Sequence, residues 1–284
     1  MKLYTYPASP ICRPIAMLIA DHGMEVEQQV VDLMAGEQNT PAFAAINPNN
    51  AVPVLEDGAF RLTECSAILK YLADVVGSPT YPKSLQARAR VNSAMDWVNT
   101  GLYRAFGYNL CYPQVLPHMK WSDATAQSLV LAAGQAGSRK WLAVMNDHML
   151  GASEWLCGDA LTIADYFASG ILSLGELIGC NFSSWPNVRR WYERMQDLPN
   201  WQRQRRALRM GKSHQKPRLR ADLSEVNPRR IGRRRRPHRE PARQPLRQQV
   251  SPKRPVKSPG SHHSVPVLRA RRTDYGQPKK EKQA

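Results

Sequence analysis

Apolar and polar positions change their period several times within the first 75 residues. Runs of β-branched and aromatic residues are typical of strands, whereas apolar residues at i, i+3 and i+4 predict helices. Residues 7–10 (PASP) have the composition of a turn, and Asp57-Gly58 joins two short apolar runs as in a β-hairpin. The pattern predicts strands over 2–6, 25–31, 52–55 and 60–62, and helices over 11–21, over 42–46, and from Thr63 or Glu64 to Leu72.

Beyond residue 76 only the helical period remains. Thr162 and Asp165 have the spacing of an N-terminal capping box. Amphipathic patterns predict helices near 86–111, 123–150, 162–178 and 187–197. The order β-α-β-(α)-β-β-α followed by helices predicts an α/β thioredoxin-like N-terminal domain and an all-α helical domain. We expect these domains over 1–75 and 86–202, with a proline-containing linker over 76–85.

The apolar pattern stops at Trp201, and the composition changes there. Residues 1–202 carry 14 Lys and Arg against 18 Asp and Glu, a net charge of −4, whereas residues 203–284 carry 26 against 5, a net charge of +21. The second segment also holds ten prolines and a single aromatic residue, Tyr275. It cannot bury enough apolar surface to offset the entropy of ordering, so we expect a disordered Arg/Pro-rich tail.

Two interpretations of the tail stay open. The run Arg233-Arg234-Arg235-Arg236 is typical of nucleic-acid-binding or nuclear-targeting segments. Without interleaved aromatic residues, it predicts polyanion binding that is electrostatic and non-specific. A reading-frame change in GC-rich DNA would also give an Arg/Pro-rich stretch. The break within a few residues of Trp201 favours this second interpretation.

The cysteines and the N-terminus indicate the compartment. The five cysteines (Cys12, Cys65, Cys111, Cys157 and Cys180) are odd in number and contain no C-x-x-C pair. We therefore expect reduced thiols, with neither a disulfide framework nor a zinc site. The sequence shows no targeting signal, no membrane-length apolar run and no metal-ligand spacing. It predicts a cytoplasmic protein without a metal.

Five short motifs follow one another in a set order along residues 1–202. They are Ser9-x-x-Cys12-Arg13, Val52-Pro53, Glu64-Cys65-x-Ala67-Ile68-x-x-Tyr71-Leu72, Leu161-Thr162-Ile163-Ala164-Asp165, and Val188-x-x-Trp191 followed by Leu198-Pro199. Together they resemble the glutathione transferases, above all theta-like and other bacterial Ser-type members. The resemblance implies a homodimeric enzyme that conjugates the thiolate of glutathione, its co-substrate, to an electrophilic small molecule.

Ser9 is the candidate catalytic residue. The resemblance implies that its hydroxyl contacts the glutathione sulfur, where a donated hydrogen bond would stabilise the thiolate and lower the pKa of the thiol. A drop of roughly two units corresponds to about 2.7 kcal/mol, within reach of a charge-assisted hydrogen bond at a helix start. Taken alone, Ser before a helix is most often an N-cap. Tyr6 is a less favoured alternative to Ser9, because other transferase classes use a tyrosine but Tyr4 and Tyr6 both fall in the first strand.

The resemblance also implies how the first domain holds glutathione. Pro53 is expected to be cis, so that the backbone of Val52 can pair with the cysteinyl backbone of glutathione. Glu64 and Cys65 match the residues that hold the γ-glutamyl amine and carboxylate, with Cys65 in place of the usual Ser. A thiol is a weak donor, so we expect binding that is weakened but not abolished.

The remaining contacts are assigned by position. Gln38 and Asn50 lie between the predicted second and third strands, where a donor to the glycine carboxylate of glutathione is needed. Aromatic residues of the helical domain would supply apolar surface for the electrophile, although a core or interface role stays open for each of them. These are Tyr103, Phe106, Tyr108, Tyr112 and Trp121.

Cys12 allows a redox interpretation of the first turn. Residues 9–12 resemble a glutaredoxin C-x-x-C motif whose first Cys has become Ser, and the missing Cys is the attacking thiol. We therefore expect Cys12 to be a small buried hydrophobic residue, and Arg13 to serve the structure or a dimer interface. The alternatives to a transferase are a non-catalytic binding or scaffold module with a nucleic-acid-binding tail and, less favoured, a thiol–disulfide oxidoreductase.

Overall fold

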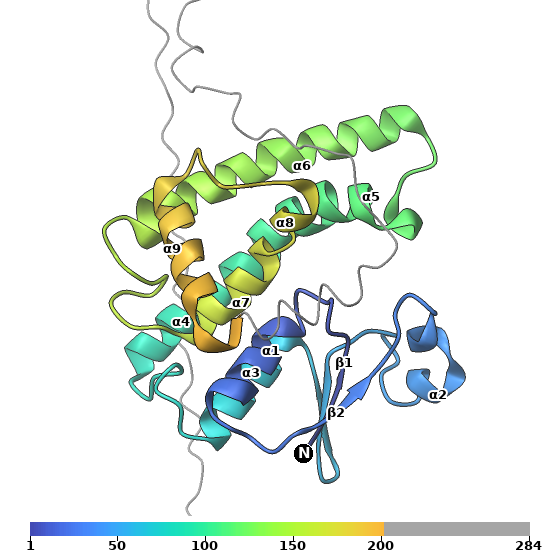
Figure 1. Cartoon of the computed structure of the whole chain (residues 1–284), viewed down its shortest axis with the longest axis vertical. Coiled ribbons are helices and arrows are strands. Elements are labelled where there is room, and N and C mark those ends of the chain that lie inside the picture. Colours follow the sequence, from blue (N-terminus) through green and yellow to red (C-terminus); the bar gives the residue numbers. More distant parts are fainter. Residues whose placement is uncertain (202–284) are drawn as a thin grey trace, which may run out of the picture. The chain divides into compact units, whose positions relative to one another are not determined.

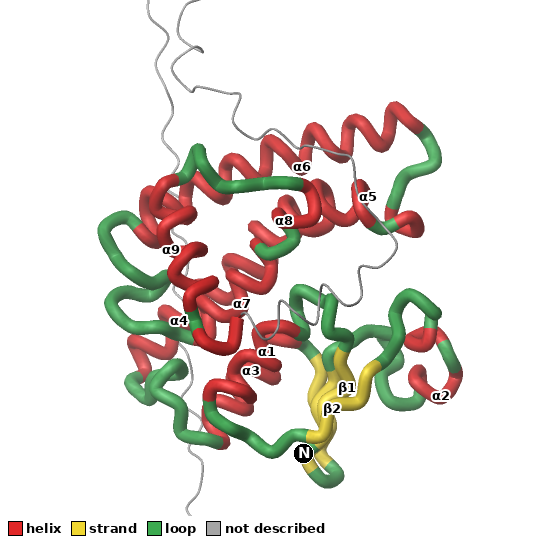
Figure 2. Tube along the Cα trace, viewed as in Figure 1, coloured by secondary structure: helices red, strands yellow, loops and turns green. Residues whose placement is uncertain are grey.

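The computed structural model describes residues 1–201, and the tail predicted over 203–284 lies outside these residues. Within them, the four strands of the sheet come before residue 64, and helices dominate the rest (Figure 2). No helix among the described residues is long and apolar enough to cross a membrane.

The strands form one mixed sheet in the order β2-β1-β3-β4. β1 is parallel to β2 and antiparallel to β3, with Tyr4 opposite Val54. β3 and β4 form the hairpin that the Asp57-Gly58 pair predicts, and Gly58 has a φ of +59°. The strands span Lys2–Thr5 (β1), Glu27–Val30 (β2), Val54–Asp57 (β3) and Phe60–Thr63 (β4).

Helices lie on both sides of this sheet. α1 and α3 lie between the sheet and the helical domain, and α2 lies on the opposite side (Figure 1). On the first side Leu3 and Leu55 pack with Ile15 and Ile68, all fully buried. On the second side Phe43 packs edge-on against Tyr4, with their ring centroids 6.1 Å apart. The helices are α1 (Arg13–Asp21), η1 (Glu37–Asn39), α2 (Pro41–Ala44) and α3 (Cys65–Val75). The thioredoxin-like fold of this domain is as predicted.

The second domain is helical, also as predicted, but its winding is not uniform. Three stretches are π-helical, with hydrogen bonds from residue i to residue i+5 in place of i+4. The helix predicted over 162–178 divides into two. The elements are α4 (Leu85–Trp97), η2 (Val98–Leu102), η3 (Arg104–Cys111), α5 (Tyr112–Val115), η4 (Pro117–Met119), α6 (Ala124–Val144), η5 (Met145–Leu150), α7 (Ile163–Leu172), α8 (Gly175–Ile178) and α9 (Pro186–Asp197). The π-helical stretches are η2, η3 and η5.

Helix α7 is buried over all ten of its residues, and its start is held by Asp165. The capping box with Thr162 forms as predicted, and the Thr162 N–H donates to Asp165 over 2.9 Å. The same fully buried carboxylate accepts hydrogen bonds from the Leu156 N–H at 2.8 Å and from Trp191 Nε1 at 2.9 Å. Asp165 thus joins the start of α7, the preceding loop and α9, which is the folding role expected of it.

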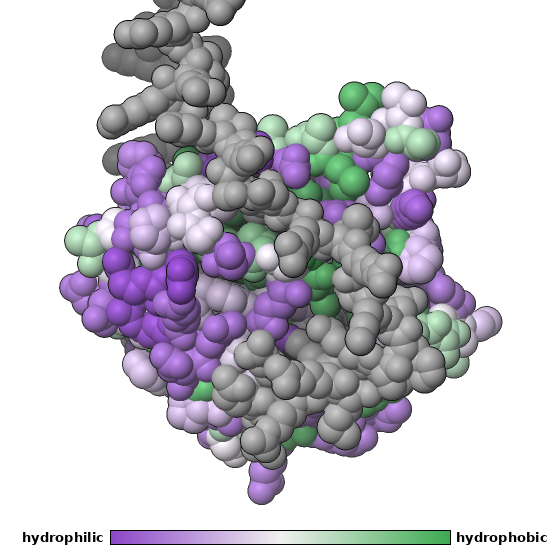
Figure 3. Space-filling model, turned by 45° about the horizontal axis from the view of Figure 1, so that its top comes forward, coloured by the Kyte–Doolittle hydropathy of each residue, from purple (hydrophilic) through white to green (hydrophobic). Residues whose placement is uncertain are grey.

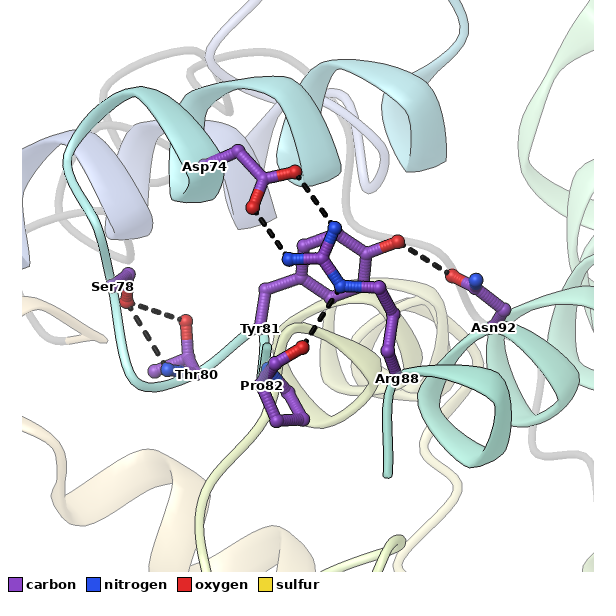
Figure 4. Close-up of polar contacts among 7 residues, drawn as sticks. All are labelled: Asp74, Ser78, Thr80, Tyr81, Pro82, Arg88 and Asn92. Carbon is purple, nitrogen blue, oxygen red and sulfur yellow. Dashed lines mark hydrogen bonds and ion pairs between the residues drawn. The ribbon is translucent and has the colours of Figure 1, made fainter. Parts of the chain in front are cut away.

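A cluster of polar contacts holds the segment between α3 and α4 in place (Figure 4). Arg88 of α4 pairs with both carboxylate oxygens of Asp74 in α3, at 2.6 and 3.1 Å, and its Nε donates to the Pro82 carbonyl at 2.8 Å. The guanidinium lies 4.1 Å from the centroid of the Tyr81 ring, whose hydroxyl donates to Asn92. The planar guanidinium group of an arginine can pair with both oxygens of a carboxylate and stack on an aromatic ring at the same time. The cluster therefore fixes the path from one domain to the other.

The last described helix packs one face inward and turns a charged face outward. α9 buries Val188 and Trp191, while Arg189 and Glu193 are exposed and paired at 2.8 Å. Hydrophilic side chains gather on the side of the molecule where α9 lies (Figure 3). Just beyond α9, Trp201 is fully buried beneath the guanidinium of Arg13, 5.2 Å from its ring centroid. Arg13 is only 4% exposed, so it serves the packing between the domains, one of the two roles expected for it.

Candidate functional site

Ser9 lies in a turn between β1 and α1. Its N–H donates to the Tyr6 carbonyl at 2.9 Å, and its own carbonyl accepts from the Arg13 N–H at 3.2 Å. The N-cap of α1 is Cys12, and no side chain caps this helix start. The alternative reading of Ser9 as an N-cap is therefore wrong, because the helix begins three residues later than a cap at Ser9 requires. The Ser9 hydroxyl does not cap the helix but is hydrogen-bonded to the Cys12 thiol, and the residue is only 8% exposed.

Cys12 is buried beneath this turn, as expected. It is 1% exposed and packs with Val52 and Val54 on the α2 side of the sheet. Burial raises the pKa of the Cys12 thiol and outweighs the opposing hydrogen bond from Ser9. A protonated, buried thiol is a poor nucleophile, which speaks against the glutaredoxin-like interpretation.

Tyr4 lies in β1, but Tyr6 follows the end of this strand, in which both tyrosines were expected. The Tyr4 hydroxyl donates to Glu56 at 3.1 Å, beside the hairpin. Tyr6 packs beside Val54, and burial raises the pKa of its hydroxyl. Tyr6 remains the alternative to Ser9.

The Val52–Pro53 peptide is cis, as the motif predicts. Val52 is 5% exposed, and in the described part of the chain its N–H and C=O take part in no backbone hydrogen bond. The loop before it is organised by the buried Asn47, which donates to the Ala51 carbonyl at 2.6 Å and accepts from the Asn49 N–H at 3.0 Å. Asn47 is a positioning residue that the sequence did not single out, because asparagine is common in any loop.

Gln38 lies in η1, just before α2, and Asn50 lies in the loop after α2. The Gln38 amide nitrogen donates to the Leu33 carbonyl over a long 3.5 Å, and its amide oxygen is buried without a hydrogen-bond partner among the described residues. Asn50 is exposed and has a φ of +52°, while its N–H donates to the Asn47 carbonyl at 2.9 Å. Both side chains thus have polar atoms that are not committed to the fold.

Glu64 immediately precedes α3 and has a φ of +68°. A positive φ is unfavourable for a residue with a side chain, and such strain is concentrated at functional sites. Glu64 is exposed and makes no side-chain capping bond, so the geometry serves neither burial nor the helix start. Glu64 thus lies exposed beside the first turn of α3, whose first N–H groups have no partner within the helix.

Cys65 is the first residue of α3 and is 4% exposed. Burial raises the pKa of its thiol well above the usual range, and the nearby Cys12 and Glu64 act in the same direction. The structure therefore places a buried, neutral thiol at the first position of α3.

A cavity of about 580 Å³ opens beside Glu64 and Cys65, between the turn at Ile11 and the helical domain. Polar and apolar side chains of the helical domain line the far side of this cavity: Asn99, Thr100, Tyr103, Arg104, Tyr108, Asn109 and Phe167. Thiol chemistry on a small molecule needs such a space next to the thiol site. Among residues 1–201, no group of three or more His, Cys, Asp or Glu is placed to hold a metal ion.

The aromatic residues proposed for the electrophile site lie in four different environments. Tyr103 and Tyr108 line the cavity, and Tyr112 is hydrogen-bonded to Tyr103 behind that lining. Phe106 is fully buried against Phe182 in the core, and Trp121 is 54% exposed and outside the lining. The polar lining residues were not predicted, because their convergence depends on the winding of η2 and η3.

The structure therefore places some of the predicted site residues at the cavity itself and others on the loops beside it. Glu64 and Cys65 share the cavity, and Ile11, two residues after Ser9, lies on its rim. Ser9, Val52 and Pro53 lie on the loops around Cys12, whose thiol helps to raise the pKa of the Cys65 thiol. Gln38 and Asn50 do not line the cavity.

Comparison with known proteins identifies the protein family that has this architecture. Residues 1–74 match the glutathione S-transferase N-terminal domain, and residues 115–199 match the glutathione S-transferase C-terminal domain. Over 216 residues the chain is 29% identical to glutathione S-transferase D7 of Drosophila melanogaster, covering 75% of this chain and 92% of that protein.

Solved structures give the same result. Human glutathione S-transferase T1-1 in its apo form is 29% identical, with a TM-score of 0.65 over 76% of this chain and 92% of that one. Human glutathione transferase theta-2, in complex with glutathione and an unknown ligand, is 28% identical, with a TM-score of 0.67 over 74% of this chain and 88% of that one. The chain belongs to the glutathione S-transferase family, with theta- and delta-class proteins among its relatives.

Proposed function

We propose that the protein is a Ser-type glutathione transferase that conjugates the glutathione thiolate to an electrophilic small molecule. In this proposal the domain over 1–75 binds glutathione, and the helical domain over 86–202 binds the electrophile. The observation that carries it is Glu64, an exposed acidic residue with a positive φ that lines the cavity at the start of α3.

Each predicted contact then has a chemical task. Ser9 donates to the glutathione sulfur and stabilises the thiolate. Val52 pairs through its backbone with the cysteinyl unit, and Pro53 holds that backbone accessible. Glu64 binds the γ-glutamyl amine. The Cys65 thiol and the first N–H groups of α3 face its carboxylate.

Gln38 and Asn50 complete the proposed site from the α2 side. Their uncommitted amide groups would donate to the glycine carboxylate of glutathione. Turning the Gln38 amide by 180° would bring its –NH2 group to the position of the buried, unpartnered oxygen. Neither side chain lines the cavity, so this contact would lie outside it.

Two further features belong to the proposal. Large apolar side chains are exposed on β4, α3 and α4, with 48% of Phe60, 49% of Val75 and 84% of Leu85 accessible, and we propose that a second copy of the chain covers them in a homodimer. The five cysteines are free, which suits a reducing compartment such as the cytoplasm.

The proposal is tested by glutathione-affinity capture of the full chain, followed by a panel of electrophiles. We expect retention on the matrix, elution by free glutathione, and an ultraviolet thiolate band for bound glutathione below its solution pKa. Retention without conjugation of any electrophile would favour a non-catalytic binding module. Failure of glutathione to elute the protein would contradict the site.

A further inference from the structure

α2 is a short helix that the rest of its domain must hold in place. It has only four residues, and a helix of this length is not stable by itself in water. It lies on the side of the sheet that faces away from the helical domain, so its support comes from the sheet (Figure 1). At its start, the Phe43 N–H donates to the Thr40 hydroxyl at 3.3 Å, and the Phe43 ring is buried.

Arg61 of β4 holds the other end of α2. Its Nη1 donates to the carbonyl oxygen of Ala45 at 3.2 Å and to that of Ile46 at 3.1 Å. Carbonyl groups at the end of a helix have no partner within the helix, and a basic side chain can supply one. Arg61 therefore caps the carboxyl end of α2 from a neighbouring strand.

Glu56 of β3 fixes the direction of the Arg61 side chain. The two residues lie directly opposite each other in the β3–β4 ladder. Nε and Nη2 of Arg61 donate to Glu56 Oε1 at 2.9 and 2.6 Å, while the second carboxylate oxygen of Glu56 accepts from the Tyr4 hydroxyl at 3.1 Å. The planar guanidinium group thus joins the sheet to the end of α2 in one fixed geometry.

The segment that follows α2 leads directly to the backbone that we propose to bind glutathione. Asn47 comes immediately after the Ile46 carbonyl that Arg61 binds, and its side chain donates to the Ala51 carbonyl at 2.6 Å. Val52 is the next residue along the chain. A displacement of the end of α2 would therefore move Asn47 and, with it, Val52.

We propose that Arg61 is a positioning residue for glutathione binding. By holding the end of α2, and through Asn47 the loop after it, Arg61 keeps the backbone of Val52 in the arrangement that receives the cysteinyl unit. The inference rests on the function proposed above and adds a residue that sets glutathione affinity from outside the site. Arg61 does not line the cavity, so it acts through the α2 segment and not by contact with the substrates.

The exposure of Arg61 favours a role in positioning over a role in stability. Its side chain is 43% exposed, and ion pairs between accessible groups contribute little to the free energy of unfolding. Without Arg61, α2 could leave the sheet locally while the rest of the fold stays intact. Glutathione would then bind only the fraction of molecules in which α2 is in place. The loss should appear in affinity and not in kcat, because Ser9 lies on a different loop, between β1 and α1.

The experiment measures the Kd of glutathione by titration calorimetry on the full chain, and KM and kcat with 4-nitrobenzyl chloride as the electrophile. In Arg61→Ala we expect the Kd and the KM for glutathione to rise by about 10-fold, the scale of one or two lost hydrogen bonds, with kcat retained. Arg61→Lys should raise both by roughly threefold, because a single ammonium group cannot reproduce the planar fork. Glu56→Gln should also have a small effect, since its amide oxygen still accepts from Arg61.

Arg88→Ala is the matched control. Arg88 also joins a carboxylate, that of Asp74, to a main-chain carbonyl, that of Pro82, but it does so between α3 and α4. Its loss should lower the melting temperature and leave the Kd of glutathione unchanged. Hydrogen exchange adds a local measurement: the amides of residues 41–52 should exchange faster in Arg61→Ala and at the wild-type rate in Arg88→Ala.

The outcomes separate this inference from the proposed function. An unchanged Kd in Arg61→Ala, or a fall in kcat alone, would overturn the inference, as would faster exchange spread over both domains. If Arg61→Ala does not fold, as judged by its melting curve, the Kd values of Arg61→Lys and Glu56→Gln decide. A wild-type chain that binds glutathione but conjugates no electrophile contradicts the proposed function, and the calorimetry still tests Arg61.

Discussion

Gly170 of α7 lies directly against the carbonyl oxygen of Pro10. A Cβ on Gly170 would overlap that oxygen and would come within 2.5 Å of the Pro14 ring. The helical domain thus meets the Ser9 turn backbone to backbone, with no side chain between them. The position of Ser9 is therefore set in part by a helix that lies more than 150 residues further along the chain.

The first prediction concerns this contact. Gly170→Ala should displace the turn, lower the free energy of unfolding by about 1–3 kcal/mol, and reduce the rate of conjugation. Urea unfolding and steady-state kinetics measure the two effects. Gly175→Ala is the control, because its neighbours Phe106, Cys180 and Phe182 are side chains at 3.1–3.2 Å and lie away from the turn. Full activity in a destabilised Gly170→Ala would contradict the coupling.

A second prediction tests Ser9. Ser9→Ala removes the hydrogen bond to the glutathione sulfur, so the pKa of the bound thiol should rise. The rising limb of kcat/KM against pH should then move to higher pH, while glutathione still binds. Ser9→Thr keeps a hydroxyl and should shift the limb less. An unchanged pH profile in Ser9→Ala would reject Ser9 and direct attention to Tyr6.

Cys65→Ser should have opposite effects on binding and on stability. A hydroxyl is a better donor than a thiol, so glutathione should bind more tightly by up to about 1 kcal/mol. Without glutathione the same hydroxyl is buried and unpaired, so the melting temperature of the free protein should fall. Titration calorimetry and thermal melts test both effects, with Cys180→Ser as the control. Equal or weaker affinity would place Cys65 outside the γ-glutamyl site.

Asp165→Asn should destabilise the fold strongly, although the two side chains have the same shape. The carboxylate accepts from Thr162, Leu156 and Trp191, and an amide must turn its –NH2 group toward at least one of these donors. A loss of about 1–3 kcal/mol follows for each buried donor left unpaired. The urea midpoint is the measurement, and the exposed Asp197→Asn should leave it unchanged. An unaltered midpoint in Asp165→Asn would mean that the hydrogen bonds rearrange without cost.

The basic tail yields a prediction from its charge alone. A net charge of +21 over residues 203–284 should bind any polyanion at low salt, with an affinity that falls steeply as salt is added and does not depend on base sequence. Changing Arg233 to Arg236 to Gln should weaken binding and flatten the salt dependence, while glutathione capture continues. Salt-resistant, sequence-selective binding by the full chain would instead make the tail a functional domain.

Much of the fold could be predicted from the sequence because short-range chemistry determines it. The hairpin at Asp57-Gly58, the Thr162 and Asp165 cap and the order of strands and helices along the chain each depend on a few neighbouring residues or on a motif. Cys12 as the true N-cap of α1 could not be predicted, since Ser9 is the better capping residue and only the turn geometry decides.

Only one side of the candidate site could be predicted from the sequence. Its glutathione side lies on loops with recognisable motifs, and Val52-Pro53 and Glu64-Cys65 carry that signal. Its other side depends on η2 and η3, whose apolar pattern is that of an ordinary helix. This stretch also packs closely against α6 at Gly134, where a Cβ would lie only 2.6 Å from the Asn109 carbonyl group. No local sequence pattern predicts such a contact.

The π-helical stretch over Arg104–Cys111 also makes the cavity sensitive to the length of the chain. Removing a single residue from this stretch would let the helix return toward 3.6 residues per turn, rotating every later side chain by roughly 100°. Tyr112 would then leave Tyr103, although no cavity-lining side chain had been exchanged. Family members could therefore diverge in the electrophiles they accept through one inserted or deleted codon, with their lining residues intact.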